Sequence, residues 1–193
     1  MAKAKPESEL PRTVEAFDRW HLFQPERWEF IAGVPVMMAP ASLPHSIIKS
    51  NIARHLGNKL EGTPCRAIVD GPEVKARSLS AIPDVVVACG RLDQSTATLS
   101  DPVLIVEVLS PSSERDDIGR KWQGYCLIPS LKHYLVVAQE LPFVTLHTRT
   151  GPSSFEERFY EDGIIELGDP GISLSLDEIY DGVEFPSAAD DHA

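Results

Sequence analysis

The chain has 193 residues, of which 42% are hydrophobic and 24% are charged. These values are typical of a folded globular domain and argue against a disordered or fibrous chain. No stretch approaches the roughly 18 apolar residues of a membrane-spanning helix, and the polar N-terminus lacks the apolar core of an export signal. We therefore expect a cytoplasmic protein with no membrane partner, comprising a flexible lead over 1–10, one domain over 11–186 and a disordered acidic tail over 187–193.

The net charge of −11 is unevenly distributed. Residues 151–193 contain twelve acids and one base, whereas the two signs balance over residues 1–150. Residues 45–77 contain six bases against three acids, so binding of a polyanion to that part of the chain is neither excluded nor demanded.

The first half of the chain predicts two helices and a hairpin. Thr13 can cap a short helix with Val14, Phe17 and Leu22 facing inward. Residues 28–38 predict a hairpin that turns near Ala32, and residues 44–60 have helical spacing of apolar side chains.

Strands are predicted over 65–75, 84–89 and 103–109, the latter two as central strands covered on both faces, with a polar loop over 90–102. A helix is expected to start at the cap Ser113 and to run to about residue 127, followed by a strand over 133–138. Residues 143–148 and 155–160 predict an antiparallel extension. This order indicates a mixed α/β or α+β fold. Because the three cysteines are widely spaced and lack metal-binding spacing, we expect Cys65, Cys89 and Cys126 to be reduced packing residues.

Glu107 is the most unusual residue, because it interrupts an otherwise apolar strand where a carboxylate is costly unless it is paired, protonated or metal-bound. Asp84 lies at the start of another apolar strand. If the two strands are adjacent, both carboxylates can hold a hard cation such as Mg²⁺ or Mn²⁺. The structural alternative is that Glu107 pairs with a Lys or Arg and Asp84 only begins a strand.

The helix after residue 113 adds a lysine to this pattern. Lys121 lies on the apolar stripe expected to face the sheet, with Ile118, Tyr125 and Ile128. It can orient a water and stabilise charge on a phosphate, or it can form a salt bridge with Glu107 or with Asp117 one turn away. Tyr125 can donate its hydroxyl to the same site or simply pack.

Several of these segments resemble a known family. The matching segments are Pro83-Asp84-Val85-Val86-Val87 and Leu104-Ile105-Val106-Glu107-Val108-Leu109-Ser110-Pro111-Ser112, followed by Asp116, Lys121 and Tyr125. They are similar to segments of the Uma-type restriction endonucleases of the PD-(D/E)XK nuclease superfamily. The resemblance spans about residues 29–138.

The resemblance implies a restriction-endonuclease-like core, a mixed sheet flanked by helices, in which Asp84 and Glu107 bind Mg²⁺ or Mn²⁺. It implies hydrolysis of DNA by a homodimer. Glu29 matches a family acid and His45 a family histidine, although His45 can equally be an ordinary helix-start residue. Glu73 could also point toward the metal or lie at a sheet edge.

The chain departs from the superfamily pattern where lysine usually follows the second acid by two positions, because Leu109 stands there. Lys121 is the natural substitute. Leu135 and Ala138 stand where the family commonly has Trp and Asp. The sequence therefore predicts a metal-dependent endonuclease with Asp84, Glu107 and Lys121 as catalytic residues; the alternative is an inactive nuclease fold that binds nucleic acid or protein.

Overall fold

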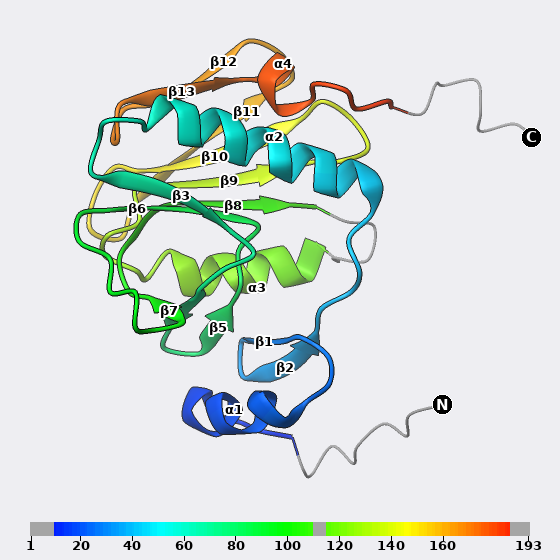
Figure 1. Ribbon diagram of the computed structural model, residues 1–193, viewed down its shortest axis with the longest axis vertical. Coiled ribbons are helices and arrows are strands. Elements are labelled where there is room, and N and C mark those ends of the chain that lie inside the picture. The colour runs from blue at the N-terminus through cyan, green and yellow to red at the C-terminus, as the bar shows by residue number, and fades with distance from the viewer. Residues whose placement is uncertain (1–9, 110–114, 186–193) are drawn as a thin grey trace, which may run out of the picture.

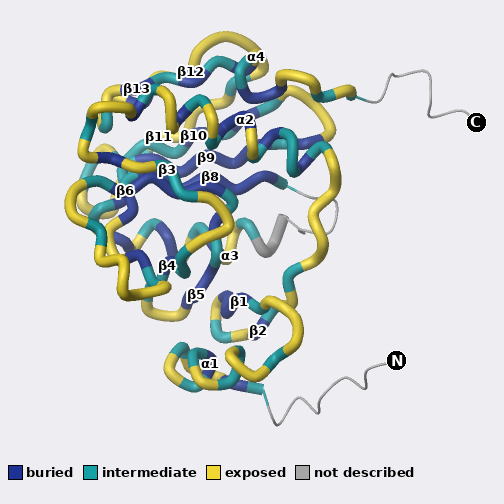
Figure 2. The backbone as a smooth tube through the Cα atoms, viewed as in Figure 1, coloured by how far each residue is buried: buried dark blue, intermediate teal, exposed yellow. Residues whose placement is uncertain are grey.

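A computed structural model of the protein describes residues 10–109 and 115–185, and a six-stranded sheet forms its centre (Figure 1). The strand order is β11-β10-β9-β8-β6-β3, and all neighbours are antiparallel except β8 and β9. The bounds are β3 (Cys65–Val69), β6 (Val85–Cys89), β8 (Pro102–Val108), β9 (His133–Val137), β10 (Val144–Arg149) and β11 (Phe155–Tyr160). The strands β6, β8 and β9 are dark blue along most of their length in Figure 2, as expected for apolar strands covered on both faces.

One face of this sheet is covered by α2 (Leu43–Lys59), together with β12 (Ile164–Leu167), β13 (Ile172–Ser175) and α4 (Leu176–Ile179). The apolar stripe of α2 explains this packing, because Ile48, Ile52 and Leu56 are buried against Val87 and Val106 of the sheet. The side chain of Asn51 fixes α2 to α4, since its amide donates to the carbonyls of Ile179 and Asp181 at 3.1 and 2.8 Å.

The opposite face is covered by α3 (Arg115–Tyr125) and by a second sheet of order β2-β1-β5-β4-β7. That sheet comprises β1 (Trp28–Ile31), β2 (Val34–Met37), β4 (Glu73–Ala76), β5 (Leu79–Ala81) and β7 (Thr98–Leu99). Gly124 lets α3 approach β5 closely, because an added Cβ would lie 2.7 Å from the Leu79 side chain. Two layers thus meet the central sheet, and Glu107 lies on the face toward α3.

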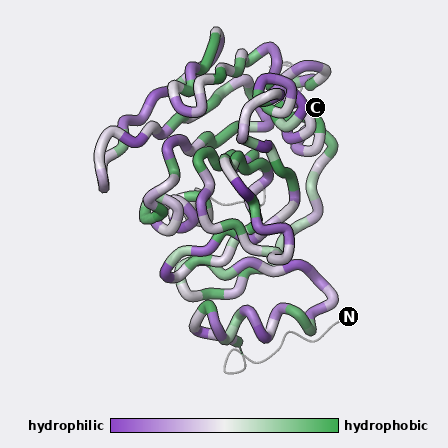
Figure 3. The backbone as a smooth tube through the Cα atoms, turned by 60° about the vertical axis from the view of Figure 1, so that its left-hand side comes forward, coloured by the Kyte–Doolittle hydropathy of each residue, from purple (hydrophilic) through white to green (hydrophobic). Residues whose placement is uncertain are grey.

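The N-terminal helix α1 (Val14–Trp20) packs on the second sheet. Thr13 caps it by accepting a hydrogen bond from the Ala16 amide at 3.2 Å, which confirms the predicted start. Phe17 is buried against Phe30, and hydropathy alternates along this helix at the bottom of Figure 3. The inward orientation predicted for Leu22 is wrong, because Leu22 lies in the following 3₁₀ turn η2 (His21–Phe23) and is 71% exposed.

The predicted hairpin is confirmed, since β1 and β2 pair and Ala32 and Gly33 take positive φ angles in the turn. The continuous strand predicted over 65–75 is wrong. It is broken into β3 and β4 at Asp70 and Gly71, and Asp70 has a left-handed φ of 46°. The loop predicted over 90–102 contains β7, and β5, β12, β13 and α4 were not predicted.

The cysteine prediction also needs correction. The structure joins Cys65 and Cys89 in a disulfide and leaves Cys126 as a free thiol. The register explains the pairing, because the two residues face each other at the end of the β3–β6 ladder with their Cα atoms 3.8 Å apart. The sequence separation of 24 residues hid this contact.

In the described residues no helix is long and apolar enough to cross a membrane. The predicted flexible lead lies outside the described residues except for residue 10. The predicted acidic tail and the predicted cap Ser113 lie wholly outside them.

Candidate active site

A buried cluster of two carboxylates and one ammonium lies between β8, α3 and β1. Glu107, Glu29 and Lys121 are only 4%, 5% and 8% exposed. The Lys121 Nζ lies 3.2 Å from each carboxylate oxygen of Glu107 and 3.0 Å from Oε2 of Glu29. The hydroxyl of Tyr125 donates to Oε1 of Glu107 at 2.9 Å, and the Ile82 amide donates to Oε1 of Glu29 at 2.8 Å.

The α3 helix brings these partners together through its periodicity. Lys121 and Tyr125 are one turn apart on the stripe that faces the sheet, as the sequence predicts, and both reach Glu107. Glu29 comes from the second sheet, so its contact with Lys121 crosses the boundary between two layers.

Burial dominates the electrostatics of this cluster. It raises the pKa of Glu107 to about 8, with the Asp84 and Glu29 carboxylates adding to the effect and Lys121 and Tyr125 opposing it. Burial alone would lower the pKa of Lys121, but the adjacent Glu107 and Glu29 carboxylates outweigh it and raise that pKa. Two acids thus share one cation, and the cluster carries a surplus of negative charge that a proton or a metal ion can neutralise.

Asp84 immediately precedes β6 and contacts two further elements, β8 and α2. Its Oδ2 accepts a hydrogen bond from the Val108 amide at 2.8 Å and lies 3.3 Å from Nε2 of His45. Its Oδ1 lies 4.0 Å from Nζ of Lys49. Burial raises the pKa of Asp84, but His45 and the Val108 amide more than offset it, so the pKa lies below its ordinary value and Asp84 is an anion at neutral pH.

Both acids open onto one cleft of about 540 Å³ at this end of the sheet. Its walls come from β1, α2, α3 and the ends of β6 and β8. The charged and titratable side chains that line it include Glu29, His45, Lys49, Asp84, Glu107 and Lys121. The cleft therefore provides the shared, accessible space that the two-acid hypothesis requires.

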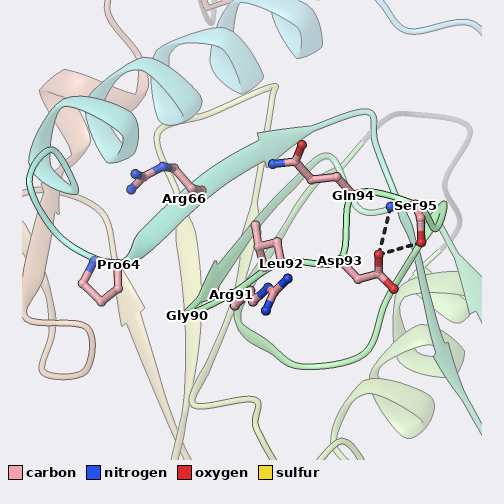
Figure 4. Close-up of a pocket in the computed structure, with 8 residues that line it drawn as sticks. All are labelled: Pro64, Arg66, Gly90, Arg91, Leu92, Asp93, Gln94 and Ser95. Carbon is pink, nitrogen blue, oxygen red and sulfur yellow. Dashed lines mark hydrogen bonds between the residues drawn. The ribbon is translucent and has the colours of Figure 1, made fainter.

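A second hollow of about 950 Å³ lies at the opposite end of β3 and β6 (Figure 4). Arg66 and Arg91 line it, and the Asp93 carboxylate there accepts hydrogen bonds from the amide and hydroxyl of Ser95. All of its lining residues except Leu92 are exposed. Because it contains no buried acid or base, the cleft at Asp84 is the better candidate for chemistry.

The structure brings together six of the seven predicted site residues. Asp84 contacts His45, and Lys121 contacts Glu29 and Glu107, the latter of which also binds Tyr125. Both groups of contacts lie at the same cleft. Glu73 lies elsewhere, on β4, where its carboxylate is 3.1 Å from both His21 and Lys75.

Lys49 and Asp70 are among the cleft residues that were not predicted as site residues. Lys49 is one helical turn after His45 on α2, so the spacing of those two bases was an available indication. Asp70 contacts Lys49 at 2.9 Å, but it does so from the turn between β3 and β4, which the sequence analysis read as part of a strand.

The donor set suits a hard divalent cation. The acids offer oxygen ligands, and their negative charge exceeds that of the single ammonium between Glu29 and Glu107. Within the described ranges, no three His, Cys, Asp or Glu side chains form a ready-made metal site. Two protein carboxylates would leave the remaining positions to water and substrate, which is how Mg²⁺ is commonly bound.

The fold matches that of a solved protein described as a putative nuclease. The structure is similar to the crystal structure of a putative nuclease of DUF820 from Anabaena variabilis ATCC 29413, with a TM-score of 0.72 and 18% sequence identity. The match covers 88% of this chain and 98% of the other. It establishes the restriction-endonuclease-like fold that the sequence predicts.

Residues 14–177 match the model of the Uma2 family, which is described as "Putative restriction endonuclease". The chain belongs to this family. It is also 30% identical, over 96% of its length, to the whole of the uncharacterized protein slr1290 from Synechocystis sp. (strain ATCC 27184 / PCC 6803 / Kazusa). A second protein of that organism, sll1609, is 33% identical over 59% of this chain and 67% of its own length.

Proposed function

We propose that the protein is a metal-dependent phosphodiesterase that acts as an endonuclease on DNA. The observation that carries the proposal is the opening of Asp84 and Glu107 onto one cleft with Lys121 at its wall. Membership of a nuclease family supports the same reaction class.

Asp84 and Glu107 would hold Mg²⁺ or Mn²⁺ through their carboxylate oxygens. When bound, such an ion acidifies a water and neutralises charge on a phosphoryl group. Lys121 remains beside Glu29 and holds the attacking water, with its ammonium also stabilising charge on the phosphate. Tyr125 fixes the orientation of the Glu107 carboxylate through its hydrogen bond. Water attacks directly, without a covalent enzyme intermediate.

The alternative is a module that kept the nuclease fold and uses it for binding only. The salt bridge between Glu107 and Lys121 is the feature that such a module would keep for structure. A closed salt bridge without a cleft would favour that alternative, whereas here the bridge lines an open cleft. The cleft therefore favours the enzyme.

A nicking assay tests the proposal. Supercoiled plasmid would be incubated with Mg²⁺ or Mn²⁺ and with the parent, Asp84→Asn or Glu107→Gln protein. We expect metal-dependent nicking by the parent and a loss of at least about a hundredfold in each variant. Equal activity in all three proteins would place the reaction elsewhere or in a contaminant, and no activity with intact metal binding would favour the binding module.

We further propose that the protein acts as a homodimer, because a duplex presents two strands for cleavage. The support is the resemblance to dimeric nucleases. Light scattering on the purified protein would decide between one and two chains.

A further inference from the structure

Lys49 occupies a position between two carboxylates of the cleft. Its Nζ lies 2.9 Å from Oδ1 of Asp70 and 4.0 Å from Oδ1 of Asp84. Its side chain is 14% exposed, so a large part of its hydration has been replaced by these two acids. The shorter distance permits a hydrogen bond and the longer one does not.

The two oxygens of Asp84 differ in how strongly they are already bound. Oδ2 accepts the Val108 amide and faces His45, which fixes the carboxylate plane. Oδ1 is the oxygen that faces Lys49. It is therefore the atom that a cation entering the cleft would reach with the least disruption.

Asp70 binds Lys49 from a turn, with its side chain half exposed. It lies in the turn between β3 and β4 with a φ of 46°, a conformation that costs a non-glycine residue free energy and is common at functional positions. Arg27 approaches its carbonyl oxygen at 3.4 Å.

An ammonium that moved from Asp70 onto Asp84 would compete with a divalent cation for the same oxygen. We infer that Asp70 is a positioning residue that holds Lys49 away from Oδ1 of Asp84 and so keeps this oxygen open to the cation. The inference rests on the proposed function, because it concerns the metal ligand assigned there. It adds two residues, Asp70 and Lys49, as determinants of metal affinity.

Titration calorimetry with Mn²⁺, without DNA, tests the pair. The proteins are the parent, Asp70→Asn, Lys49→Met and the double variant, with Glu26→Gln as control. Glu26 is an exposed acid that lines the same cleft, so its loss reports the effect of removing one negative charge. Circular dichroism and melting temperature establish that each variant is folded.

We expect Asp70→Asn to weaken Mn²⁺ binding about tenfold, because Lys49 is then free to pair with Asp84. Lys49→Met should bind Mn²⁺ at least as tightly as the parent, and adding Asp70→Asn to it should change the affinity by less than about threefold. Glu26→Gln should also change it by less than about threefold.

The inference would be overturned if Asp70→Asn lowered the Mn²⁺ affinity equally in the parent and in Lys49→Met, because equal losses would indicate a simple charge effect. Unchanged affinity in all variants would also overturn it and leave the pair a stabilising ion pair. If the parent itself binds no Mn²⁺, the metal chemistry of the proposed function fails, and the role of Asp70 fails with it. Should Asp70→Asn not fold, the inference would require Lys49→Met alone to match or exceed the parent affinity.

Discussion

At the scale of single residues, the burial of Glu107 predicts an unusual dependence of stability on pH. The folded protein holds the Glu107 proton up to about pH 8, whereas the unfolded chain releases it near 4.5. Between these values the folded state binds more protons, so this residue's contribution to the free energy of unfolding falls as pH rises. The loss should be on the order of a few kcal/mol between about pH 5 and pH 8.

Glu107→Gln removes this titration. We expect the variant to be about as stable as the parent at pH 5 and more stable at pH 8, as measured by urea unfolding. The difference between the free energies of unfolding of the two proteins at each pH removes the contributions of other titrating groups. Parallel stability profiles across this range would contradict the assigned burial effect.

Lys121→Met should lower stability above about pH 8, where Glu107 is ionised. It leaves the buried carboxylates of Glu29 and Glu107 without their shared cation, so we expect the free energy of unfolding to fall by about 3–5 kcal/mol. The double variant with Glu107→Gln should lose clearly less. Additive losses in urea unfolding would show that Lys121 stabilises the fold independently of Glu107.

At the scale of elements, α2 connects the cleft to the C-terminal part of the domain. Its first half carries His45 and Lys49, and Asn51 then donates two hydrogen bonds to the backbone around α4. Asn51→Ala should lower the free energy of unfolding by about 1–3 kcal/mol, because two carbonyls lose their partner. Asn58→Ala, at an exposed position of the same helix, is the control and should change it by less than about 0.5 kcal/mol.

The disulfide between β3 and β6 determines how many thiols the protein should present. With the Cys65–Cys89 disulfide formed, the denatured protein should titrate one thiol before reduction and three after it. Reduction should also lower stability by about 3 kcal/mol, because the bridge closes a loop of intermediate length. Three thiols before reduction would restore the reduced state that the sequence analysis predicted.

The elements differ in how far the sequence could predict them. Long apolar runs such as Val85–Cys89 and His133–Val137 identify buried strands, and the spacing of Lys121 and Tyr125 correctly directs them toward Glu107. The strands β5 and β7 have three and two residues, too few to display a period. The contact of Asp70 with Lys49 depends on the turn that separates β3 from β4, which residue patterns did not indicate.

At the scale of the whole molecule, the acidic surplus and the cleft are on different parts of the surface. The acids of residues 155–185 lie in or next to β11–β13 and α4, coloured yellow to red in the upper part of Figure 1. The cleft lies at the start of β6, between the first half of α2 and the hairpin β1–β2. A polyanion can therefore approach the cleft without passing over the acidic elements.

Arg27 provides a test of that approach. It is exposed at the cleft, so Arg27→Gln should weaken duplex DNA binding without added metal and reduce the slope of log affinity against log salt by about one. Arg158→Gln, on the edge strand β11, is the matched control and should leave the slope unchanged. Equal effects of the two substitutions in a fluorescence-anisotropy titration would place the DNA elsewhere.

The three-body contact of Glu29, Glu107 and Lys121 also constrains how related proteins can diverge. A lineage that replaces Lys121 alone is left with two buried carboxylates and no cation between them, so that replacement is selected against even where catalysis no longer matters, whereas replacing one of the acids leaves a balanced pair. Relatives should therefore lose Lys121 only together with, or after, the neutral replacement of at least one of the two acids.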